Sequence, residues 1–150
     1  MKKIVVLASG RGSNFEAILK AIEAKKLRAE ISGLVCDRAH APVLEIAKKW
    51  GIPSSVVLSE AKSGQRASHE QEMLNAVQNH GYDFVVLAGY RKILSPFFVN
   101  ACSSQDSEPT FSRILNVHPS LLPAFVGLNG YAQAFQYGVK AVSYTHLTLP

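Results

Sequence analysis

The sequence predicts an α/β protein in which an open, mostly parallel sheet is covered by helices on both faces. Two continuous apolar runs, at residues 4–8 and 84–88, are typical of strands that are buried on both faces. Between them, apolar residues recur at helical spacing, as they do from Phe15 to Ile22. Strands that alternate with helices of this length favour right-handed βαβ units, and therefore a parallel sheet.

The expected elements follow one another along most of the chain. The expected strands are residues 4–8, 31–36, 55–58, 84–88 and 114–118, and residues 144–149 also alternate like a strand. The expected helices are residues 15–22, a segment between Pro42 and Gly51, residues 65–79 and a short helix that begins at Pro96. Residues 103–109 are predicted to form a polar insertion.

Length and composition exclude several classes of protein. The chain has 150 residues, of which 47% are hydrophobic, and this fits one domain with one core rather than a disordered chain. No apolar run approaches the roughly 20 residues that cross a bilayer, and the run after Lys3 is too short for a signal peptide. Cys36 and Cys102 lack disulfide or ligand spacing, so we expect a reducing cytoplasm and no metal site.

Positive charge is scattered along the chain. The formal net charge is +5, and the basic residues form separate pairs rather than one stripe. A nucleic-acid partner and a small phosphorylated or carboxylated substrate both explain this balance. The charge alone therefore leaves the class of partner open.

The loop at residues 9–14 joins the first strand to its helix and contains two glycines. Its free backbone N–H groups and the positive helix end suit a phosphate. The same loop is also consistent with an ordinary tight turn in which Ser13 or Asn14 caps the helix. Phe15 occupies the position of the third glycine of a dinucleotide fingerprint, and the loop lacks Walker A spacing. Asp37, at the end of the second strand, stands where a ribose-binding acid would lie.

Asn116 and His118 lie near the carboxyl end of the fifth strand, directly before Pro119. Side chains that are two residues apart on a strand share a face. An amide beside an imidazole suits acyl transfer, because the amide donates to a developing oxyanion and the imidazole moves protons near neutral pH. A histidine that is merely hydrogen-bonded at a strand end explains the pattern as well.

The segment at residues 89–94 places two cations and an aromatic ring at the same sheet edge. Ligands of open parallel sheets bind at that edge, outside the carboxyl ends of the strands. The segment would suit a flat ring with an anionic tail. A solvated, charged loop is the other interpretation.

Three runs of residues carry a resemblance to a known family. They are Ser-Gly-Arg-Gly-Ser-Asn at residues 9–14, Leu-Ala-Gly-Tyr-Arg-Lys-Ile-Leu-Ser-Pro at residues 87–96 and Ile-Leu-Asn-Val-His-Pro-Ser-Leu-Leu-Pro at residues 114–123. Together they resemble the glycinamide ribonucleotide formyltransferases, which are folate-dependent enzymes of purine synthesis. The third run is specific for the wider formyltransferase family. The resemblance covers about residues 3–140 and implies a Rossmann-like formyltransferase fold.

Members of the wider family differ in their first loop and in the start of their chains. Formyltetrahydrofolate deformylases usually carry a small regulatory domain before the sheet, whereas this chain begins directly with the first strand. Methionyl-tRNA formyltransferases lack the loop Ser-Gly-x-Gly-Ser-Asn. The purine enzyme is therefore favoured, and the alternatives are a formyltetrahydrofolate deformylase and a noncatalytic nucleotide-binding module.

The resemblance also implies roles for individual residues. The implied reaction moves a formyl group from 10-formyltetrahydrofolate, as co-substrate, to the amine of glycinamide ribonucleotide. Asn116 would stabilise the oxyanion and contact folate, and His118 would transfer the proton. The implied phosphate-binding residues are Gly12, Ser13 and Asn14, and the other implied folate-binding residues are Arg66, Arg91, Lys92, Ile93 and Leu94. The resemblance implies no metal, no nucleic-acid or membrane partner, and a cytoplasmic monomer or homodimer.

The sequence departs from the family pattern at several positions. The family commonly has Met-Arg where this chain has Arg91 and Lys92, and it usually has a histidine where Tyr131 stands. From about residue 141 the sequence looks unrelated, and nothing matches the aspartate that tunes the family's catalytic histidine. We therefore expect residues 1–140 to be an incomplete formyltransferase domain without its C-terminal strands. We expect residues 141–150 to be a tail of doubtful origin, and the chain to be inactive or nearly so.

Overall fold

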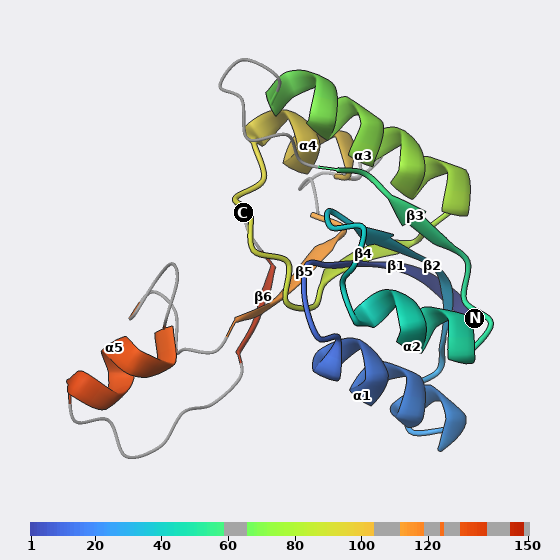
Figure 1. The fold of residues 1–150 in the computed structure, drawn as a ribbon, viewed down its shortest axis with the longest axis horizontal. Coiled ribbons are helices and arrows are strands. Elements are labelled where there is room, and N and C mark those ends of the chain that lie inside the picture. The colour runs from blue at the N-terminus through green and yellow to red at the C-terminus, as the bar shows by residue number, and fades with distance from the viewer. Residues whose placement is uncertain (59–65, 104–111, 119–123, 125–129, 138–144, 149–150) are drawn as a thin grey trace.

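The computed structural model describes residues 1–58, 66–103, 112–118, 124, 130–137 and 145–148. Within them, six strands form one sheet in the order β3-β2-β1-β4-β5-β6 (Figure 1). The strands are β1 (Lys2–Ala8), β2 (Ala29–Cys36), β3 (Ser54–Val56), β4 (Phe84–Leu87), β5 (Ile114–His118) and β6 (Thr145–Thr148). The helices are α1 (Ser13–Glu23), α2 (Val43–Lys49), α3 (Arg66–His80), α4 (Pro96–Ala101) and α5 (Gly130–Gln136).

The strand pairing confirms the predicted α/β class and the mostly parallel sheet. β1 pairs in parallel with β2 and β4, and the same holds for β2 with β3 and for β4 with β5. β6 runs antiparallel to β5 and lies within the residues that alternate like a strand. The sequence pattern does not predict α5, and its Phe135 is 82% exposed rather than packed in a core. The expected insertion at residues 103–109 lies outside the described residues except for Ser103.

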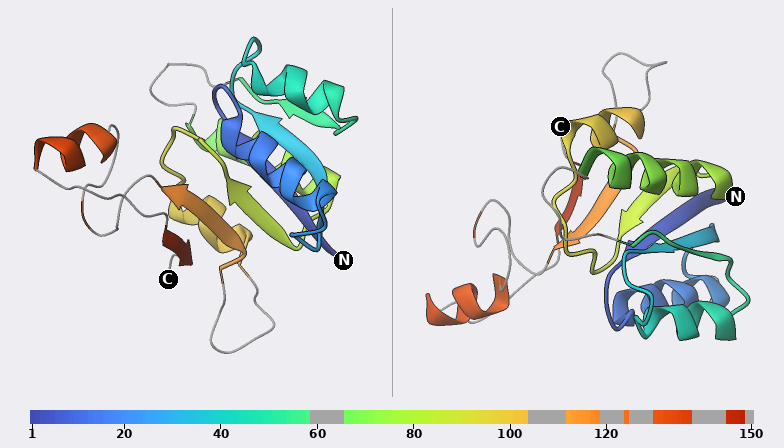
Figure 2. Two further views of the ribbon diagram at one scale, coloured as in Figure 1. Left: turned by 90° about the horizontal axis from the view of Figure 1, so that it is seen from below. Right: turned by 45° about the horizontal axis from the view of Figure 1, so that its top comes forward.

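Helices cover both faces of the sheet, as predicted. α1 and α2 lie on one face, and α3 and α4 lie on the other (Figures 1 and 2). The side chains of β1 alternate between them: Ile4, Val6 and Ala8 belong to the core cluster on the α1 and α2 face. Val5 and Leu7 belong to the cluster on the α3 and α4 face. Because both faces are buried, the strand is apolar at every one of these positions.

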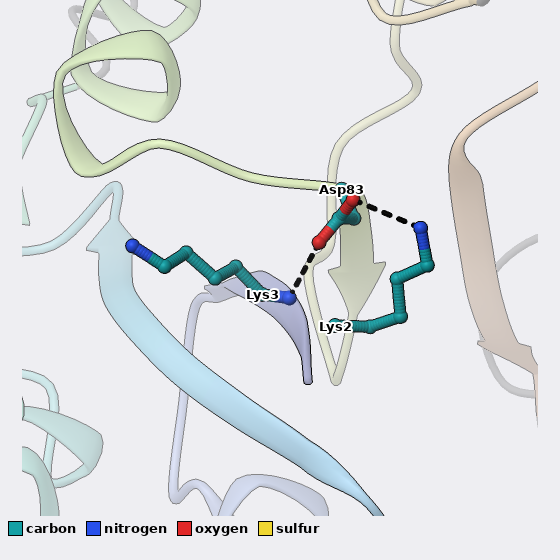
Figure 3. A network of polar contacts seen from close by, with 3 residues as sticks. All are labelled: Lys2, Lys3 and Asp83. Atoms are coloured by element: carbon teal, nitrogen blue, oxygen red, sulfur yellow. Dashed lines mark hydrogen bonds and ion pairs between the residues drawn. The ribbon is translucent and has the colours of Figure 1, made fainter.

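At the amino-terminal edge of the sheet, Asp83 connects the start of β1 to the start of β4 (Figure 3). Its carboxylate accepts hydrogen bonds from the backbone N–H of Lys3 at 2.7 Å and from Lys2 Nζ at 3.1 Å. The Lys3 N–H, and to a lesser extent Lys2, holds the pKa of Asp83 below its usual range. A hollow lined by Met1, Lys2, Arg28 and Asp83 also opens at this edge, which is the edge opposite to the predicted site.

His80, the last residue of α3, packs directly on β2. A Cβ atom at Gly33 of β2 would come within 2.3 Å of His80 Cγ, so a residue without a side chain is needed where the ring approaches. The ring Nε2 lies 2.9 Å from the hydroxyl oxygen of Ser55 in β3. Burial lowers the pKa of His80 below its ordinary value.

We expect the fold to lose stability as the pH falls through the titration range of His80. Because its pKa is lower in the folded chain, the unfolded chain binds the proton first. The stabilising contribution is therefore complete above about pH 6.5 and is lost as the pH falls toward the lowered folded pKa. Urea unfolding of the wild type and of His80→Gln between about pH 8 and pH 5 measures this difference. His40→Gln, at an exposed histidine, is the control, and parallel curves for wild type and His80→Gln would contradict the prediction.

Candidate active site

The carboxyl ends of β1, β4 and β5 meet at one edge of the sheet. In the observed register, Leu7 of β1 faces Leu87 of β4, and Leu87 in turn faces Asn116 of β5. The segments at residues 9–14 and 89–94 follow β1 and β4 directly. The register therefore brings to one edge the three segments for which the sequence predicts ligand binding.

The first loop turns into α1 at Gly12. Gly12 is the N-cap, has φ 80° and ψ 19°, and no side chain caps the helix. The interpretation in which Ser13 or Asn14 caps α1 is therefore wrong: the left-handed glycine turns the chain earlier, so Ser13 is already helical. The first backbone N–H groups of α1 thus meet no capping side chain, which keeps this loop suited to an anion. Ser13 is exposed there, and Asn14 is half-buried.

α2 fixes the path of the same loop. The backbone N–H of Val43, the first residue of α2, donates to the carbonyl of Gly10 at 3.2 Å. A Cβ atom at Gly12 would come within 2.6 Å of Val43 Cγ2 and 3.1 Å of Ile46 Cδ1. Gly12 therefore meets two requirements, a left-handed backbone and a close approach to α2.

Ser9 joins the first loop to the loop after β4. It is 1% exposed, and its backbone N–H donates to the carbonyl of Gly89 at 3.2 Å. Its Oγ accepts a hydrogen bond from the backbone N–H of Arg91 at 3.1 Å. The predicted phosphate loop and the predicted folate segment are therefore linked by one buried serine, which the sequence alone did not single out.

The segment at residues 91–94, called here the 91–94 segment, is open to solvent. Arg91 and Lys92 are exposed, and Ile93 is 85% exposed. Leu94 is half-buried and packs against the core cluster on the α3 and α4 face. The two cations and Ile93 are therefore accessible to a ligand that combines a ring with an anionic tail.

Two side chains of α3 contact the residues that flank the 91–94 segment. Tyr90 Oη donates to Met73 Sδ at 2.9 Å. Glu70, which is 5% exposed, accepts hydrogen bonds from the backbone N–H of Ser95 at 2.9 Å and from the Ser95 hydroxyl. Burial, followed by the charges of Asp37 and Glu70, raises the pKa of Tyr90 above its usual range. Glu70 is not among the residues predicted from the sequence, although an acid among the apolar positions of an expected helix is a signal for it.

Asp37 lies directly after β2 at the carboxyl edge, where the sequence placed it. It is 7% exposed, and its Oδ1 has no hydrogen-bond partner among the described residues. Its charge contributes, after burial, to the raised pKa of Tyr90. An unpaired buried acceptor at this edge suits a hydroxyl donor on a bound molecule.

Asn116 and His118 both belong to β5 and keep their two-residue spacing along a strand. Ile114, two residues before Asn116, belongs to the core cluster on the α3 and α4 face, whereas Leu115 packs against the opposite cluster. Asn116 therefore lies on the α3 and α4 face, and Tyr90 packs against the cluster of that same face.

Arg66 is the first residue of α3. Glu70 follows it four residues later on the same helix, which is about one helical turn. α3 therefore connects the predicted folate-binding arginine to the end of the 91–94 segment.

Two kinds of feature are not found in the part of the chain that the structure describes. No group of three or more histidine, cysteine, aspartate or glutamate residues there could hold a metal ion. None of the helices there has the length and apolar character that crossing a membrane requires.

One protein family matches almost the whole chain, including the three segments at the carboxyl edge of the sheet. The family model described as formyl transferase matches residues 2–148. The chain belongs to the formyl transferase family. The match includes all three segments at the carboxyl edge, and it extends as far as residue 148, into the residues expected to be a tail of doubtful origin.

Several curated proteins are similar to this formyl transferase chain. The phosphoribosylglycinamide formyltransferase of Bacillus subtilis (strain 168) is 38% identical over 146 residues, which are 97% of this chain and 70% of the relative. That of Escherichia coli (strain K12) is 36% identical over 135 residues, which are 90% of this chain and 59% of the relative. The chain thus spans between 59% and 70% of these relatives' lengths.

Solved structures share the fold. The glycinamide ribonucleotide transformylase 1 of Symbiobacterium toebii aligns with a TM-score of 0.85 at 33% identity, over 100% of this chain and 66% of that one. A formyltetrahydrofolate deformylase from Pseudomonas putida KT2440 aligns over 99% of this chain and 49% of that one, with a TM-score of 0.79. Its identity is 24%, so that likeness shows the fold alone. Family and fold confirm the predicted formyltransferase class, and the roles of individual residues stay predictions.

Proposed function

We propose that this chain serves the transfer of a formyl group from 10-formyltetrahydrofolate to the amine of glycinamide ribonucleotide in purine synthesis. The observation that carries the proposal is the sheet register that brings the three family-like segments to one edge, with Ser9 linking two of them. The relatives named phosphoribosylglycinamide formyltransferase support the same choice of acceptor.

The substrates are assigned to the two linked loops. The backbone of the first loop, at Gly12, Ser13 and Asn14, binds the ribonucleotide phosphate, because uncapped N–H groups and the positive end of α1 face an anion there. The 91–94 segment, Arg66 and Asn116 bind the folate, whose anionic tail is paired with the cations. The net charge of +5 then reflects two anionic substrates, and no nucleic acid is needed to explain it.

The chemistry falls to the two residues of β5. The substrate amine attacks the formyl carbon and forms a tetrahedral intermediate with a negatively charged oxygen. The Asn116 amide donates a hydrogen bond to that oxygen. When the intermediate collapses, the bond between the formyl carbon and the folate nitrogen breaks. His118 takes the proton that the amine loses and returns a proton to that nitrogen.

We infer further that the chain acts in the cytoplasm and that it is a monomer or a homodimer. No aspartate in these 150 residues matches the one that tunes the family's histidine, so we propose that the chain alone transfers formyl groups slowly or not at all. A chimera that joins residues 1–140 to the remaining length of the Bacillus subtilis relative supplies that part of the family pattern.

The test measures loss of formyl donor with and without glycinamide ribonucleotide. We expect both the chain and the chimera to bind the ribonucleotide and a folate analogue, and the chimera to consume donor only when the ribonucleotide is present. Donor loss that does not need the ribonucleotide would instead indicate hydrolysis by water, the deformylase reaction. Binding of NAD without binding of the folate analogue would indicate a noncatalytic nucleotide-binding module and would contradict the proposal.

A further inference from the structure

We propose that Glu70 is a positioning residue that fixes the carboxyl-terminal end of the 91–94 segment and thereby shapes the folate site. The inference rests on the proposed function, because that function assigns the segment to folate. In this proposal Glu70 acts through Ser95, whose backbone N–H and hydroxyl it accepts.

Three of the four side chains of the 91–94 segment are exposed to solvent. Arg91 and Lys92 are exposed, Ile93 is 85% exposed, and only the half-buried Leu94 packs against the core cluster. Exposed side chains fix a backbone weakly. The contacts of the residues at its two ends therefore contribute to the position of the segment.

The amino-terminal end is held from two directions. The backbone N–H of Arg91 donates to Ser9 Oγ at 3.1 Å, and the phenol of Tyr90 donates to Met73 Sδ at 2.9 Å. Ser9 is 1% exposed and Met73 is 1% exposed, so both anchors belong to the interior of the fold.

Glu70 holds the carboxyl-terminal end. It accepts the backbone N–H of Ser95 at 2.9 Å and also the Ser95 hydroxyl, and Ser95 directly follows the segment. The Ser95 Oγ in turn accepts the backbone N–H of Phe98 at 3.4 Å as the N-cap of α4. One carboxylate thus orients the hydroxyl that caps α4 and ties down the backbone where the segment ends.

The buried location of Glu70 makes the loss of this contact costly. It precedes Met73, Leu74 and Val77 on α3, three residues of at most 5% exposure in the same core cluster, and is itself 5% exposed. A carboxylate costs free energy when it is buried unless hydrogen bonds compensate, and hydrogen bonds to an ionised group are stronger than neutral ones. Removal of the carboxylate also leaves the Ser95 N–H without its acceptor.

Limited trypsin digestion of the complete chain tests the positioning directly, because Arg91 and Lys92 are exposed cleavage sites inside the segment. We expect Glu70→Ala to raise the rate of cleavage after these residues by about tenfold, the change that a loss of roughly 1.4 kcal/mol in local stability produces. Cleavage after the exposed Lys26, on another loop, reports general loosening and should not change.

Two further variants separate this contact from a general effect on α3. Glu70→Gln keeps an oxygen for the Ser95 N–H and can donate to the Ser95 hydroxyl, so we expect an intermediate rate and a folded chain even where Glu70→Ala folds poorly. Glu72→Gln replaces an exposed glutamate on the same helix and should behave as wild type.

Binding of a folate analogue gives the functional readout. We expect its Kd to rise by about tenfold in Glu70→Ala and less in Glu70→Gln, while the Kd of glycinamide ribonucleotide changes by less than about twofold. Unchanged cleavage after Arg91 together with unchanged folate affinity in Glu70→Ala would overturn the positioning role. A wild-type chain that binds no folate analogue would instead overturn the proposed function, whatever the cleavage rates are.

Discussion

Replacing Asn116 by alanine is expected to lower kcat for formyl transfer by about 10²–10³-fold, the usual cost of losing one oxyanion donor. The half-buried amide lies on the α3 and α4 face of β5, at the sheet edge where the two predicted substrate loops meet. The hydrogen bond strengthens as charge develops on the formyl oxygen, so its loss acts on the transition state more than on bound substrate. Turnover is measured in the chimera defined above, at saturating concentrations of both substrates.

The separate changes in kcat and in KM for folate show whether Asn116 acts on the reaction or on folate binding alone. An equal fall in kcat and in kcat/KM indicates an interaction made in the transition state. An unchanged kcat with a raised KM for folate would contradict the oxyanion role and leave Asn116 as a binding residue. Asn100→Ala, at an exposed position of α4, is the matched control and should retain wild-type turnover.

Most of the fold could be predicted because its signals are local. β1 is apolar at successive positions because it is buried on both faces, with Val5 and Leu7 on one face and their neighbours on the other. Apolar residues recur at helical spacing from Phe15 to Ile22 because one face of that helix is buried. α5 lacks such a signal, because Phe135 projects into solvent instead of a core. Its helix could not be found from apolar periodicity.

The edge of the sheet that holds the candidate site could be predicted, and the contacts within it could not. Parallel strands place their carboxyl ends at one edge, which brings the predicted segments together without any knowledge of side chains. The bond from Arg91 to Ser9 joins residues that are 82 positions apart, and its formation depends on the paths of two loops. The bond from Ser95 to Glu70 depends equally on the loop path. Sequence patterns report periodic burial and carry little information about such paths.

The N-cap of α1 shows how a local rule can be overridden by packing. Serine and asparagine are preferred caps, and the sequence offers both Ser13 and Asn14. The structure uses Gly12 instead, because its left-handed backbone turns the chain before Ser13, at a point where Val43 leaves no room for a side chain. This reason lies in α2, some thirty residues further along the chain, so capping statistics do not contain it.

Gly12→Ala is expected to destabilise the fold and to abolish tight binding of glycinamide ribonucleotide. The backbone at Gly12 has φ +80°, which costs an L-residue roughly 1–2 kcal/mol. The new Cβ would also lie 2.6 Å from Val43 Cγ2, and overpacking of this kind costs about 1–3 kcal/mol more. Val43 is fully buried and cannot swing away, so the loop has to move instead, and the N–H groups at the start of α1 lose their position. Urea unfolding and titration with the ribonucleotide measure the two effects.

Two companion variants identify the cause of that loss. Gly10→Ala lies in the same loop, where an added Cβ meets nothing within 4 Å, so it should stay close to wild type in stability and binding. Val43→Ala removes Cγ2, the nearer of the two Val43 atoms that a Cβ at position 12 would strike, and keeps the Val43 Cβ at 2.8 Å. The clash is therefore relieved in part, and the double variant should be less destabilised than the sum of the single variants predicts. Strict additivity would show that the contact with Val43 Cγ2 contributes nothing to the effect of Gly12→Ala. Equal stability of Gly12→Ala and Gly10→Ala would contradict both causes, and with them the reason why glycine stands at this turn.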